Sequence, residues 1–357
     1  MGVFYVLLFV PIAIQHIVVN KSHIDFEKKN RGALAFFFFF LAVLLMLRHE
    51  SVGSDTKNYV YFFHRFAQTD WAALGKSSLE IGFVYFNKIL SLFSQDPRFF
   101  LIVTAAVICT PMYYLYRRLC IDSSLSIVLF CTMSTFVMLF SGIRQMLAIA
   151  IGILAYEFTR KKKLYFFIPA VILAMSVHTS AIMLFFMYPL YYAKITKKWL
   201  YAVVPTLILM FVFDRQIFAV LGLILERYTG YDATIVQTGA YTMLMLFVIF
   251  SVFAFLIPDE SVLDEETIGL RNFLLFSLAI QMFAPLHTIA MRMNYYYIIF
   301  IPLLLPKIIA ARSKRWEQVA IVGRYVMVCF FLVYFFISAS QEGNLSVFPY
   351  RFFWEVA

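Results

Sequence analysis

The chain has 357 residues, of which 63% are hydrophobic and only 14% are charged, and its mean hydropathy is +0.83. A soluble domain is about 45–50% apolar and about 25% charged, so this composition excludes an ordinary soluble protein and indicates a polytopic membrane protein. The net charge of +10 comes from basic residues in short loops between apolar segments. That pattern is typical of positive-inside orientation and contact with anionic lipid, and it argues against nucleic-acid binding.

Apolar segments of roughly transmembrane length recur along the whole chain. A helix needs about 20 mainly apolar residues to cross a bilayer, and the shorter segments are expected to tilt little or to break within the membrane. We therefore predict an all-α bundle of about twelve transmembrane helices that forms a single domain over residues 1–357. The predicted spans lie near residues 2–19, 33–48, 98–117, 124–141, 143–159, 164–178, 180–193, 199–213, 239–257, 272–289, 294–310 and 319–338.

Short basic clusters at the ends of spans determine the predicted orientation. The runs at residues 160–163 and 194–198 lie in short loops, and such clusters remain on the cytoplasmic side of a membrane. Both termini are then expected outside, together with two longer outer segments, about 49–97 and about 214–238. We expect a short apolar helix in each outer segment, lying in the membrane interface. The aromatic and basic tail segment 349–354 is suited to the headgroup layer.

One of these interfacial helices carries a polar stripe. Polar residues recur at helical spacing on an otherwise apolar segment, residues 79–94. Such a stripe is expected to lie in the interface or to face a wet cavity, which makes Glu80 and Asn87 candidates for substrate contact. The stripe consists of Glu80, Asn87, Ser91 and Ser94.

The first sustained polar stretch, from Arg48 to Tyr59, opens the first outer segment. It combines an arginine, carboxylates, a glycine and small hydroxyl residues in a very hydrophobic chain. Charged residues at a membrane are costly to place and are therefore candidates for a functional site. Two interpretations stand for the carboxylates on this side: salt bridges to arginines, or chemistry at a site. These carboxylates are Glu50, interpreted as structural, Asp55 and Glu80.

The segment Ser141–Gln145 combines an expected helix start with an arginine. Ser141 is expected to cap the next helix, and Gly142 permits a tight turn. Free backbone N–H groups, the positive end of the helix dipole and Arg144 would together form an anion site suited to phosphate. The alternative is that Arg144 extends to the lipid headgroups. An arginine one turn inside a helix of an apolar bundle is costly, however, unless it has a partner.

His178 and Arg292 add two ionisable groups at the same predicted level of the membrane. His178 opens a His-Thr-Ser segment at another outer junction, where a polar or catalytic role and a structural role are both open. Arg292 lies between two later spans. Together with Arg48 and Arg144, these residues are predicted to converge on one face of the membrane from four separate helix pairs.

Several catalytic and cofactor-binding motifs are absent from the sequence. There is no DxD pair for a divalent metal beside a nucleotide sugar, no P-loop, no HExxH and no GxSxG. We predict no metal and no cofactor, and an ATP-driven pump, a zinc protease and a metal-dependent nucleotide-sugar transferase lose support. The four cysteines form no CxxC pair and are interpreted as small buried hydrophobic residues.

Taken in order, these motifs resemble the EpsG-like group of Wzy-type polysaccharide polymerases of bacterial inner membranes. Ser54 is a departure, because the pattern usually has threonine there. The resemblance rests on Val52–Tyr59 after Arg48, Glu80–Phe83 with Asn87, Ser141–Gln145 followed by Ala148, His178–Ser180 and Arg292–Tyr297.

The resemblance implies a GT-C-like, metal-independent glycosyltransferase of O-antigen, capsule or exopolysaccharide biosynthesis, at the periplasmic face of the inner membrane. Such a polymerase joins oligosaccharide repeat units carried on undecaprenyl pyrophosphate. Its partners are then a lipid-linked donor, a lipid-linked acceptor and the bilayer, with a chain-length regulator as a further one. The growing chain leaves its lipid pyrophosphate, and arginines with a helix N-terminus can stabilise the departing charge in place of a metal.

This hypothesis gives each candidate residue a role. Asp55 is the first choice for positioning the acceptor hydroxyl or accepting its proton, followed by Glu80, with His178 as the rival base. The residues expected to bind pyrophosphate and sugar are Arg48, Tyr59, Asn87, Arg144, Gln145 and Arg292.

Two other functions remain open from the sequence. A flippase or other transporter of lipid-linked oligosaccharides would also need a cationic cavity, but its charges should lie near the bilayer midplane and be reachable from both sides. A membrane O-acyltransferase acting on surface polysaccharide would also use histidine and arginine. Accumulation of untranslocated units on deletion would indicate the flippase, and loss of acetyl groups with normal chain length would indicate the acyltransferase.

Overall fold

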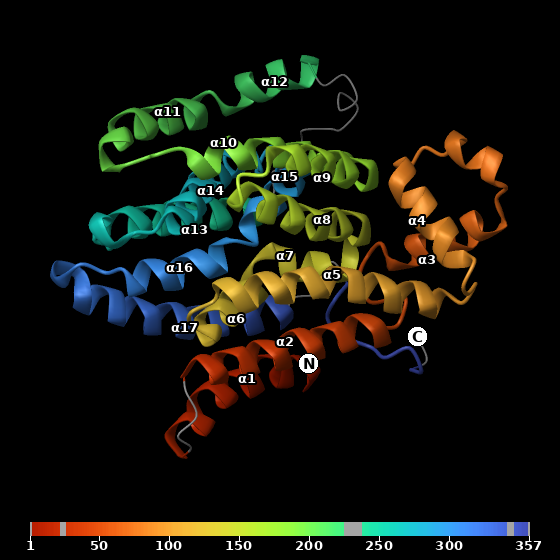
Figure 1. The fold of residues 1–357 in the computed structure, drawn as a ribbon, viewed down its shortest axis with the longest axis horizontal. Helices are drawn as coiled ribbons and strands as arrows, with labels where there is room; N and C mark the ends of the chain where they lie inside the picture. The colour runs from red at the N-terminus through yellow and green to blue at the C-terminus, as the bar shows by residue number, and fades with distance from the viewer. Residues whose placement is uncertain (1, 22–25, 225–237, 341–345, 356–357) are drawn as a thin grey trace. The chain divides into compact units, whose positions relative to one another are not determined.

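The structure is a computed structural model that describes residues 2–21, 26–224, 238–340 and 346–355 (Figure 1). The regular secondary structure of these residues is helical, apart from two isolated β-bridges, Arg48 with Phe352 and Pro258 with Arg312. The all-α prediction is therefore confirmed for the part of the chain that the structure describes.

The chain packs into two compact units, which are described separately. Unit 1 comprises residues 1–185 together with residues 322–357, and unit 2 comprises residues 186–321. The prediction of a single domain over residues 1–357 stays a prediction.

Unit 1 holds the N-terminal helices and most of the final helix, α17. Within it, α1, α2 and α5 lie side by side, and α8 packs along α9 (Figure 1). Its elements are α1 (Gly2–Lys21), α2 (Phe26–Leu47), α3 (Thr56–Gln68), η1 (Trp71–Lys76), α4 (Ile81–Ser91), α5 (Pro97–Leu119), α6 (Ser123–Thr132), α7 (Ser134–Ser141), α8 (Ile143–Arg160), α9 (Leu164–Val177), η2 (Thr179–Phe186, shared with unit 2) and α17 (Glu317–Ser340).

Unit 2 is built around α14, which packs against α10, α13 and α15. Asp264 caps this helix by accepting a hydrogen bond from the Thr267 backbone N–H at 2.7 Å, which satisfies one of the free donors at the helix start. Its elements are α10 (Met187–Tyr192), η3 (Lys197–Trp199), α11 (Leu200–Val212), α12 (Asp214–Ile224), α13 (Thr238–Leu256), η5 (Glu260–Val262), α14 (Glu265–Gln281), α15 (Thr288–Ile298), α16 (Ile301–Ala310) and η6 (Lys314–Trp316).

Some predicted spans are broken rather than continuous. The segment predicted as one helix over 124–141 consists of α6 and α7, which are bent by 63° where Met133 adopts an extended conformation. The Thr132 hydroxyl bonds back to the Val128 carbonyl at 2.9 Å, and such back-bonding favours a bend. The segment predicted over 294–310 is likewise bent by 47° between α15 and α16.

Four helical segments among the described residues are long and apolar enough to cross a membrane. They are Phe26–Leu47, Pro97–Leu119, Gly239–Leu256 and Lys314–Ala339. The number rises to as many as seven if each of three bent helix pairs counts as one span. The structure thus supports a multi-pass membrane protein, and the number of about twelve spans stays a prediction.

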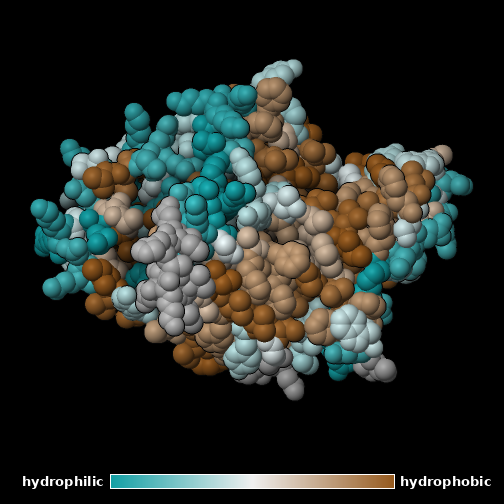
Figure 2. Space-filling model, turned by 60° about the horizontal axis from the view of Figure 1, so that its bottom comes forward, coloured by the Kyte–Doolittle hydropathy of each residue, from teal (hydrophilic) through white to brown (hydrophobic). Residues whose placement is uncertain are grey.

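Hydrophobic side chains cover much of the surface drawn in Figure 2. Large apolar residues such as Phe39 and Tyr165 are strongly exposed, which is expected where a helix faces lipid. Cys329 on α17 is also exposed, so the prediction that all four cysteines are buried is wrong for this one. The reason is that only 17% of the residues in the apolar stretch of α17 are buried.

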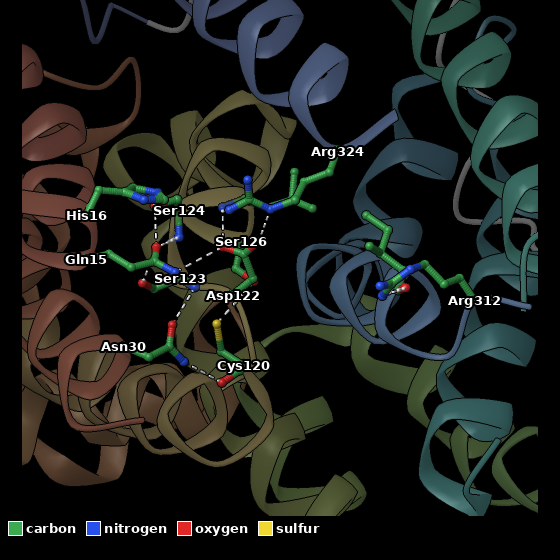
Figure 3. A network of polar contacts seen from close by, with 12 residues as sticks. Gln15, His16, Asn30, Cys120, Asp122, Ser123, Ser124, Ser126, Arg312 and Arg324 are labelled. Atoms are coloured by element: carbon green, nitrogen blue, oxygen red, sulfur yellow. Dashed lines mark hydrogen bonds and ion pairs between the residues drawn. The ribbon is translucent and has the colours of Figure 1, made fainter. Parts of the chain in front are cut away.

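A buried polar network ties four elements of unit 1 together at the start of α6 (Figure 3). Asp122 caps α6 and accepts hydrogen bonds from Gln15 Nε2 at 3.3 Å and from Arg324 Nε at 2.5 Å. Asn30 accepts from the Ser123 backbone N–H at 2.6 Å and donates to the Cys120 carbonyl at 2.8 Å. Because these residues belong to α1, α2, the α5–α6 turn and α17, the network determines how these elements pack.

Candidate functional site

The loop that precedes α3 is docked against the junction of α7 and α8. The Ser54 backbone N–H donates to Ser141 Oγ at 3.1 Å, and Thr56 Oγ1 donates to the Phe140 carbonyl at 3.1 Å. Gly53 has a φ of +90°, and a Cβ at this position would lie 2.1 Å from the Phe140 carbonyl oxygen. Only glycine fits this backbone, and this explains why the polar stretch turns so tightly here.

These contacts change the expected role of Ser141. It was predicted to cap α8, but it is the last residue of α7, and Gly142 occupies the cap position without a side-chain hydrogen bond. Its hydroxyl instead accepts the Ser54 N–H from the docked loop. The sequence pattern correctly marked a helix start but not the long-range partner of the serine.

Arg48 is a buried cation at the end of α2. It is only 2% exposed, and its Nε has no hydrogen-bond partner among the described residues. Its guanidinium lies 6.0 Å from the centroid of the Phe140 ring. Burial lowers the pKa of Arg48 to about 10, while the nearby Tyr350, Cys109 and Tyr59 partly oppose this shift. The side chain therefore remains charged at neutral pH.

Glu80 and Arg144 form the centre of the site. Arg144 Nη1 donates to Glu80 Oε2 at 2.5 Å, and the other carboxylate oxygen of Glu80 accepts from both the backbone N–H and the hydroxyl of Thr179 at 3.1 Å. Both charged side chains are about one-fifth exposed. The pair joins the starts of α4, α8 and η2, three elements that are distant in sequence.

The packing of α4 against α9 brings Glu80 to this position. A Cβ on Gly82 would lie 2.3 Å from Ser176 Oγ and 2.7 Å from the Ser176 carbonyl oxygen, so the first turn of α4 touches the end of α9 directly. Glu80 itself is extended, with φ −60° and ψ 133°, and it precedes the helix. The prediction that Glu80 lies on a helix as part of the polar stripe is therefore wrong.

The environment of Glu80 favours its ionised form. Burial alone would raise the pKa of this carboxyl and is the largest single influence. The attraction of Arg144, the Thr179 N–H and His178 together outweigh burial and hold the pKa below its ordinary value of 4.5. Glu80 is thus an anchored anion, with both carboxylate oxygens engaged.

Tyr59 lies within electrostatic reach of both arginines. Burial raises the pKa of its hydroxyl, and the charge of Arg144 with a hydrogen bond to that residue opposes part of the shift. The ring packs edge-on against Phe83 at 5.8 Å between centroids, and the Arg144 guanidinium lies 5.9 Å from the same Phe83 ring. Arg48 and Arg144 thus both interact electrostatically with the buried Tyr59.

The sequence matches the model of the EpsG family over residues 33–352. The chain belongs to the EpsG family. This family is associated with polysaccharide polymerase-like proteins, and the chain is a membrane protein of polysaccharide biosynthesis. No curated protein and no solved structure matched it.

Asp55, another of the three predicted catalytic residues, lies at the start of α3 in this EpsG protein. It precedes α3, it is half-buried, and its side chain makes no cap hydrogen bond. Its backbone carbonyl accepts the Tyr59 N–H at 3.1 Å, and its charge contributes to raising the pKa of Tyr59. Asp55 therefore lies on the same side of α3 as the tyrosine that contacts Arg144.

His178 and Thr179 follow α9 directly. His178 Nδ1 lies 3.0 Å from Ser180 Oγ and 3.3 Å from the Ser180 backbone nitrogen, which orients the imidazole ring. Its charge helps to lower the pKa of Glu80, so the histidine lies close to the ion pair. The segment after it begins as the 3-10 helix η2 rather than as an α-helix.

Asn87 and Gln145 are both buried, and Asn87 does not reach the site surface. Asn87 Nδ2 donates to the Phe83 carbonyl one turn earlier at 2.7 Å, and the residue is 0% exposed. At Asn87, therefore, the predicted polar stripe does not face a wet cavity. Burial of Asn87 inside α4, which spans only Ile81–Ser91, is the physical reason. Gln145 follows Arg144 in α8.

Arg292 belongs to unit 2, on α15, and is exposed. Its charge lowers the pKa of His287 in addition to the larger effect of burial on that histidine. The structure therefore brings together Arg48, Asp55, Tyr59, Glu80, Arg144 and His178 in unit 1, and the predicted approach of Arg292 to them stays a prediction. Residues 225–237 of the predicted outer segment, about 214–238, lie outside the described residues.

The C-terminal tail is a part of this site that the sequence interpretation missed. The His49 N–H donates to the Arg351 carbonyl at 2.9 Å, the Phe353 N–H donates to the Leu47 carbonyl at 2.9 Å, and the Gly53 N–H donates to the Ser346 carbonyl. Tyr350 OH donates to the Leu44 carbonyl at 2.7 Å. Through these hydrogen bonds the tail holds the loop that carries Arg48.

Arg98 was also missed as a structural residue of this region. Its guanidinium lies 3.8 Å from the centroid of the Phe353 ring, and its Nη1 donates to the Arg48 carbonyl at 3.1 Å. The aromatic and basic composition of the tail was the available signal, but it was interpreted as contact with lipid headgroups. Among the described residues, no group of three or more histidine, cysteine or acidic side chains is placed to hold a metal.

Proposed function

We propose that this EpsG-family protein is a polysaccharide polymerase that joins oligosaccharide repeat units carried on undecaprenyl pyrophosphate. The reaction takes place at the periplasmic face of the bacterial inner membrane, within a GT-C-like bundle of about twelve spans. The acceptor hydroxyl oxygen forms a bond with the anomeric carbon of the donor chain, while the bond from that carbon to the pyrophosphate oxygen breaks. The pyrophosphate leaves with the bonding electron pair, and a base takes the hydroxyl proton.

The observation that carries the proposal is the buried Arg48 guanidinium. It is charged at neutral pH, and none of the described residues supplies a carboxylate to pair with it. Removing a charged group from water without a partner is costly, so the arrangement favours a site that receives an anion. A departing pyrophosphate is such an anion, and cations placed in advance stabilise developing charge most effectively.

Arg144 is the second pyrophosphate ligand in this proposal. Glu80 uses one carboxylate oxygen to hold Arg144 and the other to hold Thr179, so we assign Glu80 a positioning role. A carboxylate whose pKa lies below its ordinary value is a weak proton acceptor, which argues against Glu80 as the base. Arg292 is proposed as a further ligand of a lipid-linked pyrophosphate.

Asp55 is the proposed base for the acceptor hydroxyl, with His178 as the rival. The Asp55 carboxylate is partly accessible and makes no cap hydrogen bond, so it can receive a substrate hydroxyl. In this proposal Tyr59 and Gln145 contact the sugar, and Asn87 supports this part of the site from within α4. The remaining partner of the reaction is the bilayer itself, which delivers donor and acceptor by their lipid tails.

Complementation of a strain that lacks this gene tests the proposal. Wild-type protein is expected to restore a ladder of polymer lengths, whereas Arg48→Gln and Arg144→Ala should leave single repeat units on the lipid carrier. Arg65→Gln is the matched control, because Arg65 is exposed on α3 and should leave the ladder intact. A normal ladder with both site variants would exclude this anion site, and repeat units trapped in the cytoplasm would indicate a flippase.

A further inference from the structure

Unit 2 contains a large apolar cavity that the proposed polymerase reaction does not use. Its volume is about 830 Å³, within the range of about 300–1,000 Å³ typical of ligand sites. The walls come from α11, α13 and α14, and the lining residues are apolar apart from Lys197, Tyr241 and Ser251.

Two apolar stripes face this cavity. On α11 the stripe contains Val204, Ile208 and Phe211, and on α13 it contains Met245 and Val252, at the spacings of a single helix face. All five side chains are strongly exposed, and none of the residues of α11 is buried. Two complementary apolar stripes that line one space without burying each other leave room for a third apolar body.

The length of the cavity suits one membrane leaflet. The stretch of α11 from Leu200 to Phe211 is about 16 Å long at the helical rise of about 1.5 Å per residue. This is about half of the hydrocarbon core, which is about 30 Å thick. The cavity therefore fits the acyl chains of a lipid of one leaflet better than a chain that crosses the whole bilayer.

One end of the cavity is cationic. Lys197 lines the cavity and is the first residue of η3, the turn that precedes α11. The same turn contributes Lys198 and Trp199 to a small neighbouring pocket of about 320 Å³. Lysine and tryptophan at the end of an apolar helix are typical of the headgroup level of a membrane. The phosphate of an anionic lipid can be bound by basic side chains in such a pocket between helices.

Other charged residues near the Lys197 end of the cavity already have interaction partners. Asp259 interacts with Lys197 electrostatically, but its carboxylate accepts from the Ser261 N–H at 3.0 Å and from the Ser261 hydroxyl at 2.7 Å. Arg271, which stacks on the ring of the lining residue Phe255 at 4.1 Å, is paired with Glu260 at 2.7 Å. Lys197 is thus the cation that lines the cavity itself.

We infer that unit 2 binds an anionic phospholipid, with its acyl chains between α11 and α13 and its phosphate at Lys197 and Lys198. The lipid takes the place of direct helix contact, so it stabilises α11 against the rest of the unit. This inference concerns a resident lipid and does not depend on the proposed polymerase reaction.

The test measures the thermal stability of the purified full-length protein in detergent with added lipid. Phosphatidylglycerol is expected to raise the unfolding midpoint by several degrees more than phosphatidylcholine does. The Lys197→Ala/Lys198→Ala variant should lose this difference. The control is Lys161→Ala/Lys163→Ala, which removes two exposed lysines from the α8–α9 turn and should keep it.

Three results would overturn the inference. The first is an equal response to both phospholipids, and the second is a full response in the Lys197→Ala/Lys198→Ala variant. The third is stabilisation by a polyprenyl phosphate with none by phosphatidylglycerol, which would assign the cavity to the substrate carrier. Mass spectrometry of lipids that copurify with wild-type protein and with the double variant supplies a second readout that requires no unfolding.

Filling the cavity gives a further check on the acyl-chain position. Val204→Trp places a large ring in the space between α11 and α13 and should abolish the stabilisation by phosphatidylglycerol. Val322→Trp is the matched substitution, at an exposed apolar position of α17 that does not line the cavity. An unchanged lipid response in Val204→Trp would place the lipid elsewhere.

Discussion

Arg144 and Glu80 lie 64 residues apart in the sequence, and Arg144 Nη1 donates to Glu80 Oε2 at 2.5 Å. This ion pair connects the start of α8 with the residue before α4, and through Thr179 it also reaches the segment after α9. The candidate site of this EpsG-family protein is therefore built where three helix ends meet. That arrangement leads to the predictions that follow.

The coupling between Glu80 and Arg144 should be measurable in a double-mutant cycle. Glu80→Gln, Arg144→Gln and the double variant are compared by the free energy of unfolding in detergent. We expect a coupling of about 1.5–3 kcal/mol, because the hydrogen bond is charge-assisted and mostly buried. The exposed pair Glu27–Arg31 on α2 is the control, and its coupling should be about 0.3–0.5 kcal/mol. Equal couplings would contradict a special role of the site pair.

The stability of the protein should fall in acid in a way that depends on Glu80. Because the folded-state pKa of this carboxyl is lowered below 4.5, its contribution to stability is complete above about pH 4.5. The contribution is lost as the pH falls through the folded-state pKa. Thermal unfolding of wild type and Glu80→Gln between pH 7 and pH 3 checks this, and the two midpoints should converge as the pH falls. A difference that stays constant with pH would exclude this linkage.

Gly53→Ala should disrupt the docked loop. The new Cβ would collide with the Phe140 carbonyl oxygen, and the φ of +90° is unfavourable for alanine. We expect a loss of more than about 1 kcal/mol in the free energy of unfolding, together with a shortened polymer ladder. Gly75→Ala is the matched control, because nothing lies within 4 Å of a Cβ at that position. If both variants behave like wild type, the loop is not constrained as described.

The C-terminal tail should be required for the site. Tyr350→Phe removes the hydrogen bond to the Leu44 carbonyl and should lower the free energy of unfolding by about 1 kcal/mol. Truncation after residue 345 removes every contact of the tail with the Arg48 loop and should abolish polymer ladders while the protein still inserts in the membrane. Tyr61→Phe, an exposed tyrosine on α3, serves as the control. Normal ladders from the truncated protein would show that the C-terminal tail is dispensable.

The polar network at α6 should contribute to stability rather than to chemistry. Asp122→Asn removes the charge that pairs with Arg324 and weakens the cap of α6, so the free energy of unfolding should fall by about 1–3 kcal/mol. The matched change Asp96→Asn affects the exposed cap of α5 and should cost about 1 kcal/mol or less. Chemical unfolding in detergent distinguishes the two. A larger effect at Asp96 would contradict the importance of the network.

Much of the helical architecture could be predicted from the sequence, because the length and composition of an apolar segment indicate a membrane helix. The predicted segment 98–117 corresponds closely to α5, and the segment 33–48 corresponds to the later part of α2, which already begins at Phe26. Breaks in the shorter segments were expected, but their positions near Met133 and Phe300 were not predicted, since a bend depends on local back-bonding and on neighbouring helices. The short polar helix α3 lacks the apolar run on which the prediction relied.

The sequence by itself determined which side chains are costly in a membrane, and hence that Arg48, Glu80 and Arg144 are candidates for a site. It could not determine their partners, because an ion pair over 64 residues and a tail that returns to Leu44 depend on long-range packing. Tertiary structure alone decided that Asn87 is buried and that Arg48 is held by the C-terminal tail. The physical reason is that hydropathy is a property of each residue, whereas the pairing of buried charges is a property of the assembled helices.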